Sequence, residues 1–249
     1  MARDYVADNL ETPNLDRLFP NMAEFDRSVS TWPWLRRDID HPYRADRRNP
    51  IVGFINRDEA SILYASARLF QGCAGLEIGA WRGWSTAHLI ASGLRSLDVV
   101  EPLLADPAWR AEFEAVVRDA GGAERTTLVP ETSPEAVVRL GEAGQRWSFV
   151  FIDGDHDGEG PTRDALACLP YFEPTGMVLF HDLVSPHVAK GLRAFEQAGW
   201  RVMAYQTAQM VGVAWRGDVA PVAHTPDPAQ NWTVPDHLSG IPISGVAGS

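Results

Sequence analysis

Between residues 57 and 217, short apolar runs alternate with longer amphipathic segments. The runs at 149–152 and 177–180 are apolar at every position rather than at every second one, which is typical of strands covered on both faces of a sheet. This alternation predicts an α/β fold with a doubly wound, mostly parallel sheet. The expected strands cover residues 75–80, 97–101, 126–129, 147–153, 176–181, 200–205 and 210–215, and the expected helices cover residues 57–70, 84–94, 107–120, 134–142, 159–169 and 186–197.

The last two of these seven strands are separated by only a few residues, which is too short for a crossover helix. They are expected to form an antiparallel hairpin at one edge of the sheet. In an open parallel sheet the ligand lies beyond the carboxyl ends of the strands. Polar residues that follow the strands are therefore the candidates for function.

Composition changes at both ends of this alternating region. Residues 1–50 show little sustained periodicity and contain the aromatic residues Trp32, Trp34 and Tyr43. Residues 218–249 hold five of the 18 prolines and are expected to form an irregular tail that frays at its very end. We therefore expect an N-terminal cap or oligomer-contact segment at 1–50, a core at 51–217 and a tail at 218–249.

Charge and cysteine content narrow the class of protein. The chain has 33 acidic and 22 basic residues and a net charge of −11, which argues against general nucleic-acid binding because that requires a basic surface. No apolar run approaches the roughly 20 residues that span a bilayer, and the first residues lack the order of a signal peptide. Cys73 and Cys168 are too few for a disulfide scaffold. These features are typical of a cytoplasmic protein without membrane or nucleic-acid partners.

The turn after the first strand combines glycines with an acidic neighbour. Gly79 and Gly83 allow a tight turn and the close approach of a ligand, although a simple strand-to-helix turn explains them equally well. Glu77, on an otherwise apolar strand, suits a cationic or hydroxyl-bearing ligand. Trp81 stands where a dinucleotide fingerprint needs bare backbone, which disfavours NAD. Glu101 ends the second strand and either accepts hydrogen bonds from a ribose diol or is a surface charge.

Carboxylates and imidazoles follow the fourth and fifth strands. Asp153, Asp155 and His156 come after the fourth strand, and His181 and Asp182 come after the fifth. If these strands are neighbours, Asp153 and Asp182 lie close together and repel one another. A divalent cation with oxygen ligands and waters would resolve the repulsion. A hydrogen-bonded Asp153–His181 or Asp155–His156 pair without metal is the other interpretation.

The order of these motifs resembles that of the class I S-adenosylmethionine-dependent methyltransferases. The motifs are Glu-x-Gly-x-x-x-Gly at 77–83, the acid at the end of the second strand, Ile-Asp-Gly-Asp-His at 152–156 and Phe-His-Asp at 180–182. Within that class, the chain is similar to the branch of macrocin O-methyltransferases and cephalosporin hydroxylase-type proteins of bacterial biosynthetic clusters. The resemblance covers residues 57–217 and implies the Rossmann-like methyltransferase fold.

The resemblance also implies roles for the residues at the strand ends. The implied S-adenosyl-L-methionine site consists of Glu77, Gly79, Ala80, Trp81, Gly83, Ser85, Glu101, Thr132, Ser133 and Asp153. Glu101 would hold the ribose hydroxyls, and Thr132 and Ser133 would border the adenine. Asp153 and Asp182 match the metal-ligating positions of metal-dependent O-methyltransferases, which implies Mg²⁺ or another divalent cation.

Two positions depart from the pattern of the catechol-type relatives. Those relatives have a lysine three residues after the first Asp and an Asn after the second, whereas this chain has His156 and Leu183 there. The third metal ligand is then His181 or Asp155, with His181 preferred, or the metal is absent. The only lysine, Lys190, lies in a later predicted helix, so His156 becomes the expected catalytic base, with Asp153 beside it.

The expected function is metal-assisted methyl transfer from S-adenosylmethionine to a hydroxyl group of a small molecule. Residues 1–50 would form the cap over the site or the contact of a homo-oligomer. One alternative is a protein of this fold that acts as a hydroxylase component or binds the cofactor without transferring a methyl group. A nucleotide-sugar or NAD-linked enzyme is the other.

Overall fold

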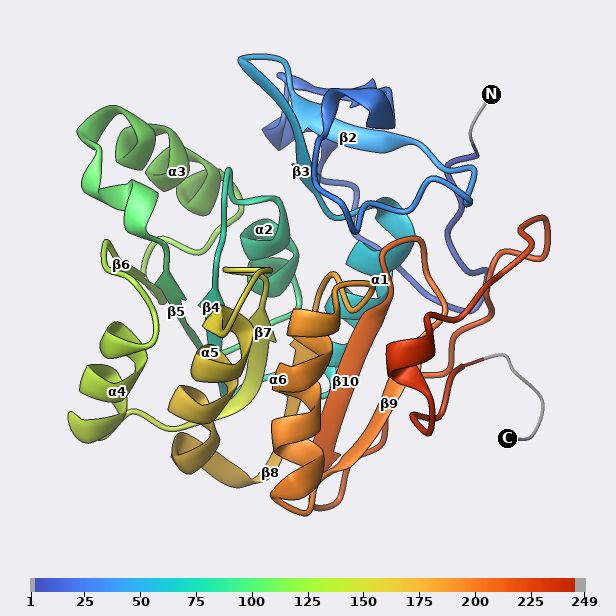
Figure 1. The fold of residues 1–249 in the computed structure, drawn as a ribbon. Helices are drawn as coiled ribbons and strands as arrows, with labels where there is room; N and C mark the ends of the chain where they lie inside the picture. Colours follow the sequence, from blue (N-terminus) through green and yellow to red (C-terminus); the bar gives the residue numbers. More distant parts are fainter. Residues whose placement is uncertain (1–2, 245–249) are drawn as a thin grey trace.

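The computed structural model describes residues 3–244, and its centre is a twisted sheet of seven strands (Figure 1). The strand order is β6-β5-β4-β7-β8-β10-β9. The strands are β4 (Ala74–Ile78), β5 (Ser96–Val100), β6 (Thr126–Val129), β7 (Trp147–Ile152), β8 (Phe172–Phe180), β9 (Arg201–Tyr205) and β10 (Val211–Arg216). The first five are parallel, and β10 pairs antiparallel with both β8 and β9. The predicted α/β fold with an antiparallel edge hairpin is confirmed.

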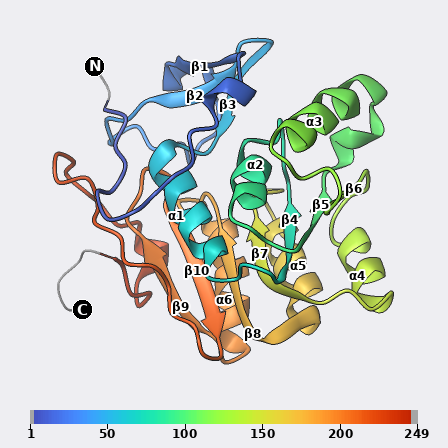
Figure 2. The ribbon, with the colours of Figure 1, turned by 180° about the vertical axis from the view of Figure 1, so that it is seen from behind.

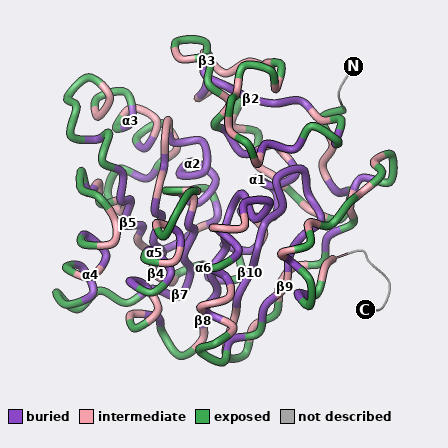
Figure 3. Tube along the Cα trace, viewed as in Figure 1, coloured by how far each residue is buried: buried purple, intermediate pink, exposed green. Residues whose placement is uncertain are grey.

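Helices cover both faces of this sheet (Figures 1 and 2). One face carries α1 (Arg57–Arg68), α2 (Trp84–Ala91) and α3 (Pro107–Asp119), and the other carries α4 (Glu135–Glu142), α5 (Gly160–Cys168) and α6 (Pro186–Gln197). Side chains of β7 alternate between the two: Phe149 and Phe151 pack with the α1–α3 side, and Val150 and Ile152 with the α4–α6 side. Because both faces are covered, the middle of the sheet is buried (Figure 3) and β7 is buried along its whole length, which explains its uninterrupted apolar run.

The predicted boundaries differ from the observed ones mainly at β8. This strand begins at Phe172, four residues before the predicted start. The prediction began too late because residues 173–175 (Glu-Pro-Thr) are largely exposed and interrupt the apolar pattern. Helix α2 ends at Ala91, three residues early, and Gly93 just beyond it has a φ of 90°. A left-handed glycine at this place ends a helix.

The N-terminal segment contains a three-stranded antiparallel sheet that the pattern of apolar residues does not predict. It is formed by β1 (Met22–Phe25), β2 (Tyr43–Asp46) and β3 (Asn49–Phe54) in that order. β2 is buried at all four positions although two of them are charged, and β3 contains Pro50, which an edge strand tolerates. Neither strand therefore has a recognisable pattern. The predicted boundary at residue 50 falls inside β3, and the small sheet lies beyond the carboxyl ends of the parallel strands (Figure 1).

Residues 218–244 are mostly irregular, with one short 3₁₀ helix at Asp236–Leu238. The segment nevertheless packs on the core through the buried Leu238 and Ile241. His224 Nε2 lies 2.9 Å from Oδ2 of Asp58 at the start of α1. The predicted frayed end, residues 245–249, lies outside the described residues. No helix in the described part of the chain is long and apolar enough to cross a membrane.

Candidate active site

A cavity of about 590 Å³ lies at the carboxyl ends of the parallel strands, between them and the N-terminal sheet. A volume of this size is typical of sites for small ligands and cofactors. Its walls include eleven of the predicted site residues: Gly79, Ala80, Trp81, Ser85, Glu101, Thr132, Ser133, Asp153, His156, His181 and Asp182. The ends of separate strands therefore bring most of the predicted site together.

Glu101 follows β5 and fixes the turn after β4. Its Oε2 accepts hydrogen bonds from the backbone N–H groups of Ala80 and Trp81, both at 3.0 Å, and its Oε1 accepts one from Leu103 at 2.9 Å. A carboxylate offers about four acceptor positions, so one on Oε1 is still open to a ligand. Trp81 Nε1, also at the cavity wall, is buried without a hydrogen-bond partner among the described residues. These groups fit the hydroxyl and polar groups of a nucleoside cofactor such as S-adenosylmethionine.

Gly79 has a structural reason to be glycine besides the predicted approach of a ligand. Its φ is 79°, in the left-handed region, and a Cβ there would overlap the carbonyl oxygen of Asp153 and lie 2.6 Å from Cα of Gly154. The turn after β4 thus rests directly on the turn after β7. This contact positions Asp153 relative to the cavity.

Glu77 and Gly83, both predicted to belong to the cofactor site, are not among the residues that line the cavity. Glu77 is fully buried behind the wall, where its Oε2 accepts a hydrogen bond of 2.5 Å from Oγ1 of Thr86 in α2. Gly83, with φ of 86°, precedes the first residue of α2. Burial raises the pKa of Glu77 to about 8; the hydroxyls of Ser85 and Thr86 oppose this, and the nearby carboxylates add to it. Both residues shape the strand-to-helix turn rather than the cavity surface.

Replacing Glu77 by glutamine is expected to flatten the pH dependence of stability. In the unfolded chain Glu77 loses its proton near its usual pKa, whereas in the folded protein it keeps the proton up to about pH 8. Between these values, rising pH therefore lowers the free energy of unfolding, by at most about 1.4 kcal/mol per pH unit. Urea unfolding at pH 5 and pH 8 should show a smaller loss for Glu77→Gln than for the wild type.

The matched control for this measurement is Glu142→Gln, at an exposed glutamate that ends α4. It removes an exposed carboxylate and leaves the buried carboxylate of Glu77 in place. The same pH dependence in Glu77→Gln and the wild type would contradict the raised pKa of Glu77.

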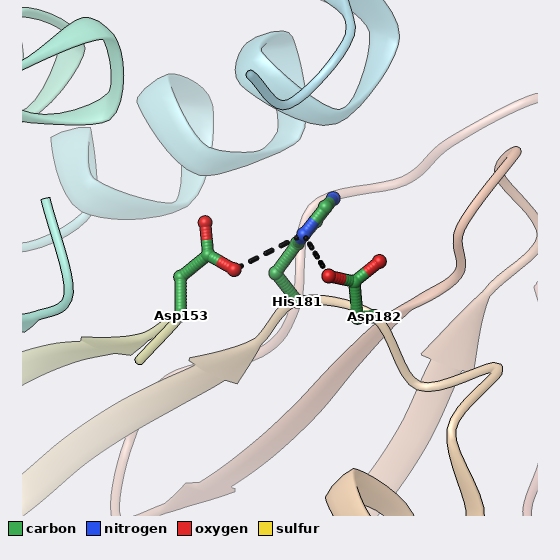
Figure 4. Close-up of side chains that lie close together, drawn as sticks. All are labelled: Asp153, His181 and Asp182. Atoms are coloured by element: carbon green, nitrogen blue, oxygen red, sulfur yellow. Dashed lines mark hydrogen bonds and ion pairs between the residues drawn. The ribbon is translucent and has the colours of Figure 1, made fainter. Parts of the chain in front are cut away.

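Asp153, His181 and Asp182 converge at the ends of β7 and β8 (Figure 4). Nδ1 of His181 lies 3.2 Å from Oδ1 of Asp153 and 3.3 Å from Oδ2 of Asp182. Ligand atoms that share one cation at about 2 Å are separated by about 3 Å. The two separations from His181 are close to this value, and the three ligand atoms lie within 4.8 Å of one another, so these residues could hold a divalent metal ion. The Asp153–His181 hydrogen bond of the alternative interpretation is also present. A cation and a protonated His181 are therefore two ways to balance the same carboxylates.

The charges of this cluster act on its imidazoles. Burial alone would lower the pKa of His181, but Asp182, Asp153 and Glu59 outweigh it and raise the pKa well above its usual value. His181 and His156 in turn hold the pKa of Asp182 below its usual range, against the effect of burial. The cluster is thus a set of strongly coupled charges in a largely buried position.

His156 lies beside the same two carboxylates. Its Nε2 is 3.1 Å from Oδ1 of Asp153 and 3.3 Å from Oδ2 of Asp182. Burial would lower its pKa, but Asp182 and Asp153 raise it to about 9. The ring of Trp32, from the N-terminal segment, is 5.6 Å from the His156 ring. The hydrogen-bonded Asp155–His156 pair of the alternative interpretation is not formed, because His156 turns to Asp153.

Two residues of this site, Glu59 and Gln209, were not predicted from the sequence. Both line the cavity and are almost completely buried. Glu59 lies three residues after Asn56, and this spacing is the signature of a helix capping box, which the structure contains. The signal visible in the sequence therefore explains Glu59 as a cap. Gln209, in the turn between β9 and β10, has no sequence signal at all.

The N-terminal segment closes the outer side of the cavity. Trp32 and Tyr43 line it, whereas Trp34 packs against His187 of α6 at a ring distance of 6.2 Å. The only lysine, Lys190, is exposed on α6 and pairs with Glu159 at 3.3 Å, away from the cavity. This position is consistent with the prediction that Lys190 is not the catalytic base.

Comparisons with known proteins agree with the fold. Residues 76–183 match a family model described as a methyltransferase domain. No curated protein matches the chain.

Solved structures with the same fold include three O-methyltransferase-type proteins. A Klebsiella pneumoniae protein assigned provisionally to the O-methyltransferases is 21% identical, with a TM-score of 0.59, covering 84% of this chain and 92% of that one. An O-methyltransferase of Bacillus cereus in complex with SAH is 18% identical, with a TM-score of 0.52, over 66% and 83%. An O-methyltransferase of Streptomyces achromogenes involved in tomaymycin synthesis, in complex with SAM, is 17% identical, with a TM-score of 0.52, over 78% and 92%.

At these identities the solved structures establish the fold and leave the acceptor open. The narrower branch suggested by the motifs stays a prediction. The match of the family model over residues 76–183 and the shared fold support the broader resemblance, to the class I S-adenosylmethionine-dependent methyltransferases.

Proposed function

We propose that this chain transfers a methyl group from S-adenosylmethionine to a hydroxyl oxygen of a small molecule, with His156 as the general base and with a divalent cation at Asp153, His181 and Asp182. One observation carries the proposal. The imidazole of His156, within 3.3 Å of the carboxylates of Asp153 and Asp182, shares a cavity with Glu101 at the end of β5. A base and a charged cluster thus face the place where the resemblance puts the cofactor.

The reaction needs positioning and the removal of one proton. Bound S-adenosylmethionine would supply a methyl group on a positively charged sulfur. The bond from carbon to sulfur breaks while a bond from carbon to the acceptor oxygen forms, and the hydroxyl proton passes to Nε2 of His156. The residues that hold the cofactor and the acceptor in line contribute the proximity effect. Glu101 fixes the cofactor side through the turn after β4.

The carboxylates of Asp153 and Asp182 link the proposed cation to the protonation state of His156. His156 accepts a proton only when it is neutral, and Asp182 and Asp153 favour its protonated form. A cation held by Asp153, His181 and Asp182 would offset that charge and would act as a Lewis acid on the acceptor hydroxyl. Metal and base are therefore proposed together.

The N-terminal segment supplies the walls for the acceptor. Trp32 stands next to His156, and Tyr43, Ile51 and Phe54 add further apolar surface. Flat apolar walls beside a few polar groups favour an acceptor with an aromatic or similarly flat body. Whether this segment also joins two copies of the chain stays a prediction.

Cofactor binding is tested first. S-adenosylhomocysteine at 100 times its dissociation constant should stabilise the protein by about 2.7 kcal/mol, visible as a higher melting temperature, whereas NAD should not. Glu101→Ala should weaken this binding. Stabilisation by NAD alone would contradict the proposal and favour the NAD-linked alternative.

Transfer is tested next, with labelled S-adenosylmethionine and a panel of hydroxyl-bearing aromatic molecules. Methyl transfer that stops on chelation and returns with a divalent cation supports the proposal. Binding of S-adenosylhomocysteine without transfer to any member of a broad panel would favour a protein that only binds the cofactor.

A further inference from the structure

Glu59 connects α1, which lies outside the matched domain, to the charged cluster. Its side chain is 2% exposed. Its Oε2 lies 3.2 Å from Nε2 of His181 and accepts a hydrogen bond from the backbone N–H of Asn56 at 3.2 Å, and its Oε1 accepts one from the backbone N–H of Gln209 at 2.8 Å. Partners from three parts of the chain therefore fix both oxygens of this carboxylate.

The two nitrogens of His181 face different carboxylates. Nδ1 points between Asp153 and Asp182 (Figure 4), at 3.2 and 3.3 Å, while Nε2 points to Glu59. An imidazole that binds a metal through one nitrogen donates its other N–H to a carboxylate or carbonyl, which fixes both the tautomer and the orientation of the ring. Glu59 occupies the place of that outer carboxylate.

We propose that Glu59 is the positioning residue of a cation centre formed by Asp153, His181 and Asp182, and that this centre selects a transition-metal ion such as Zn²⁺ over Mg²⁺. Glu59 keeps the proton of His181 on Nε2, so that the lone pair of Nδ1 faces the two aspartates. The inference rests on the cation of the proposed function and specifies its ligand chemistry.

Asp182 is held by an equivalent outer contact. Its Oδ1 accepts a hydrogen bond of 3.1 Å from Nε2 of Gln209, which leaves Oδ2 facing the imidazoles. The backbone of Asp182 has a φ of 57°, a conformation that non-glycine residues adopt at a cost and that persists where the surroundings enforce it. Because Gln209 binds both Glu59 and Asp182, the outer contacts of the two ligands form one network.

The nitrogen donor decides the class of ion. Mg²⁺ prefers an all-oxygen set of carboxylates, carbonyls and waters. Imidazole favours ions such as Zn²⁺, Ni²⁺, Cu²⁺ and Fe²⁺. A centre with two carboxylates and one imidazole that is oriented from outside therefore favours a transition-metal ion.

The experiment measures metal binding by the full-length protein without cofactor or acceptor. Calorimetric titrations with Zn²⁺, Ni²⁺ and Mg²⁺ should show that at least one transition-metal ion binds about tenfold or more tightly than Mg²⁺. Glu59→Ala should weaken its binding by about 10–100-fold. Glu59→Gln keeps an acceptor oxygen for Nε2–H and should recover part of this loss. With Co²⁺, the visible spectrum should lose its nitrogen-ligand contribution in His181→Ala.

Asn56→Ala is the matched control. The side chain of Asn56 accepts a hydrogen bond from the backbone N–H of Glu59 at 2.9 Å and completes the capping box, but it does not contact His181. Its loss should lower the melting temperature through α1 and leave the metal affinity unchanged. An equal loss of affinity in Asn56→Ala and Glu59→Ala, unchanged affinity in Glu59→Ala, or Mg²⁺ binding as tight as that of the transition metals would overturn the inference.

The metal titrations and the methyl-transfer assay can succeed or fail independently of each other. Glu59-dependent binding of Zn²⁺ or Ni²⁺ in a protein that transfers no methyl group would leave this inference standing and remove the function. Methyl transfer by a protein whose metal affinity does not depend on Glu59 would do the opposite.

Discussion

Replacement of His156 by alanine is expected to lower the rate of methyl transfer by about 10²–10⁴-fold, the usual contribution of a general base. The imidazole lies beside Asp153 and Asp182 on the cavity wall, and alanine has no group that takes up the proton of the acceptor hydroxyl. Single-turnover rates with saturating S-adenosylmethionine measure the effect. The affinity for S-adenosylhomocysteine should stay unchanged, because the proposed cofactor side, Glu101 and the turn after β4, keeps its residues.

Lys190→Ala is the control for the identity of the base. Lys190 is the only lysine of the chain and is exposed on α6, so its loss should leave the rate unchanged. A His156→Ala variant with the full rate of the wild type would remove His156 from the mechanism. A large effect in Lys190→Ala would return the role to a lysine.

Replacement of Gly79 by alanine is expected to destabilise the protein by about 2–5 kcal/mol, combining the strain of the left-handed conformation with overpacking. The new Cβ would overlap the carbonyl oxygen of Asp153 and press on Gly154, so the turn after β7 has to move. Since that turn carries Asp153 and His156, the rate should fall as well. Urea unfolding measures the first effect and the single-turnover rate the second.

Gly72→Ala separates strain from steric overlap. Gly72 has nearly the same φ, 81°, but a Cβ added there would meet no atom within 4 Å. This variant should therefore lose only about 1–2 kcal/mol of stability, the cost of the left-handed conformation for alanine, and keep its rate of methyl transfer. Equal losses of stability in the two variants would show that the contact between the turns after β4 and β7 has no energetic role.

The central sheet was predictable because its strands are covered on both faces. An uninterrupted apolar run such as 149–152 needs no tertiary information to be recognised as a buried strand. The N-terminal sheet was not predictable for the opposite reason. In β2 the charged Arg44 and Asp46 are buried as ion pairs, Arg44 with Asp4 near the N-terminus and Asp46 with Arg48 in the turn after β2, so burial there does not follow hydrophobicity.

The inner part of the site was predictable and the outer part was not. Asp153, His156, His181 and Asp182 each follow a strand, and parallel strands bring their ends together. Glu77 was assigned to the cavity because a carboxylate on an apolar strand suggests a ligand, whereas in the structure Thr86 is its partner behind the wall. Glu59 contacts His181 across 122 positions of sequence, a separation that no local pattern encodes.

The contact between Asp58 and His224 bears on when the site is completed during synthesis on the ribosome. Asp58, next to Glu59, is buried, and its carboxylate receives the N–H of Ala7 at 3.1 Å and lies 2.9 Å from Nε2 of His224. A buried carboxylate without its partner is costly. Until His224 has emerged from the ribosome, Asp58 lacks this partner, and the start of α1, which is the turn that holds Glu59, is less stable. The C-terminal segment thus contributes a partner to the turn that holds Glu59, although it lies outside both the parallel sheet and the cavity.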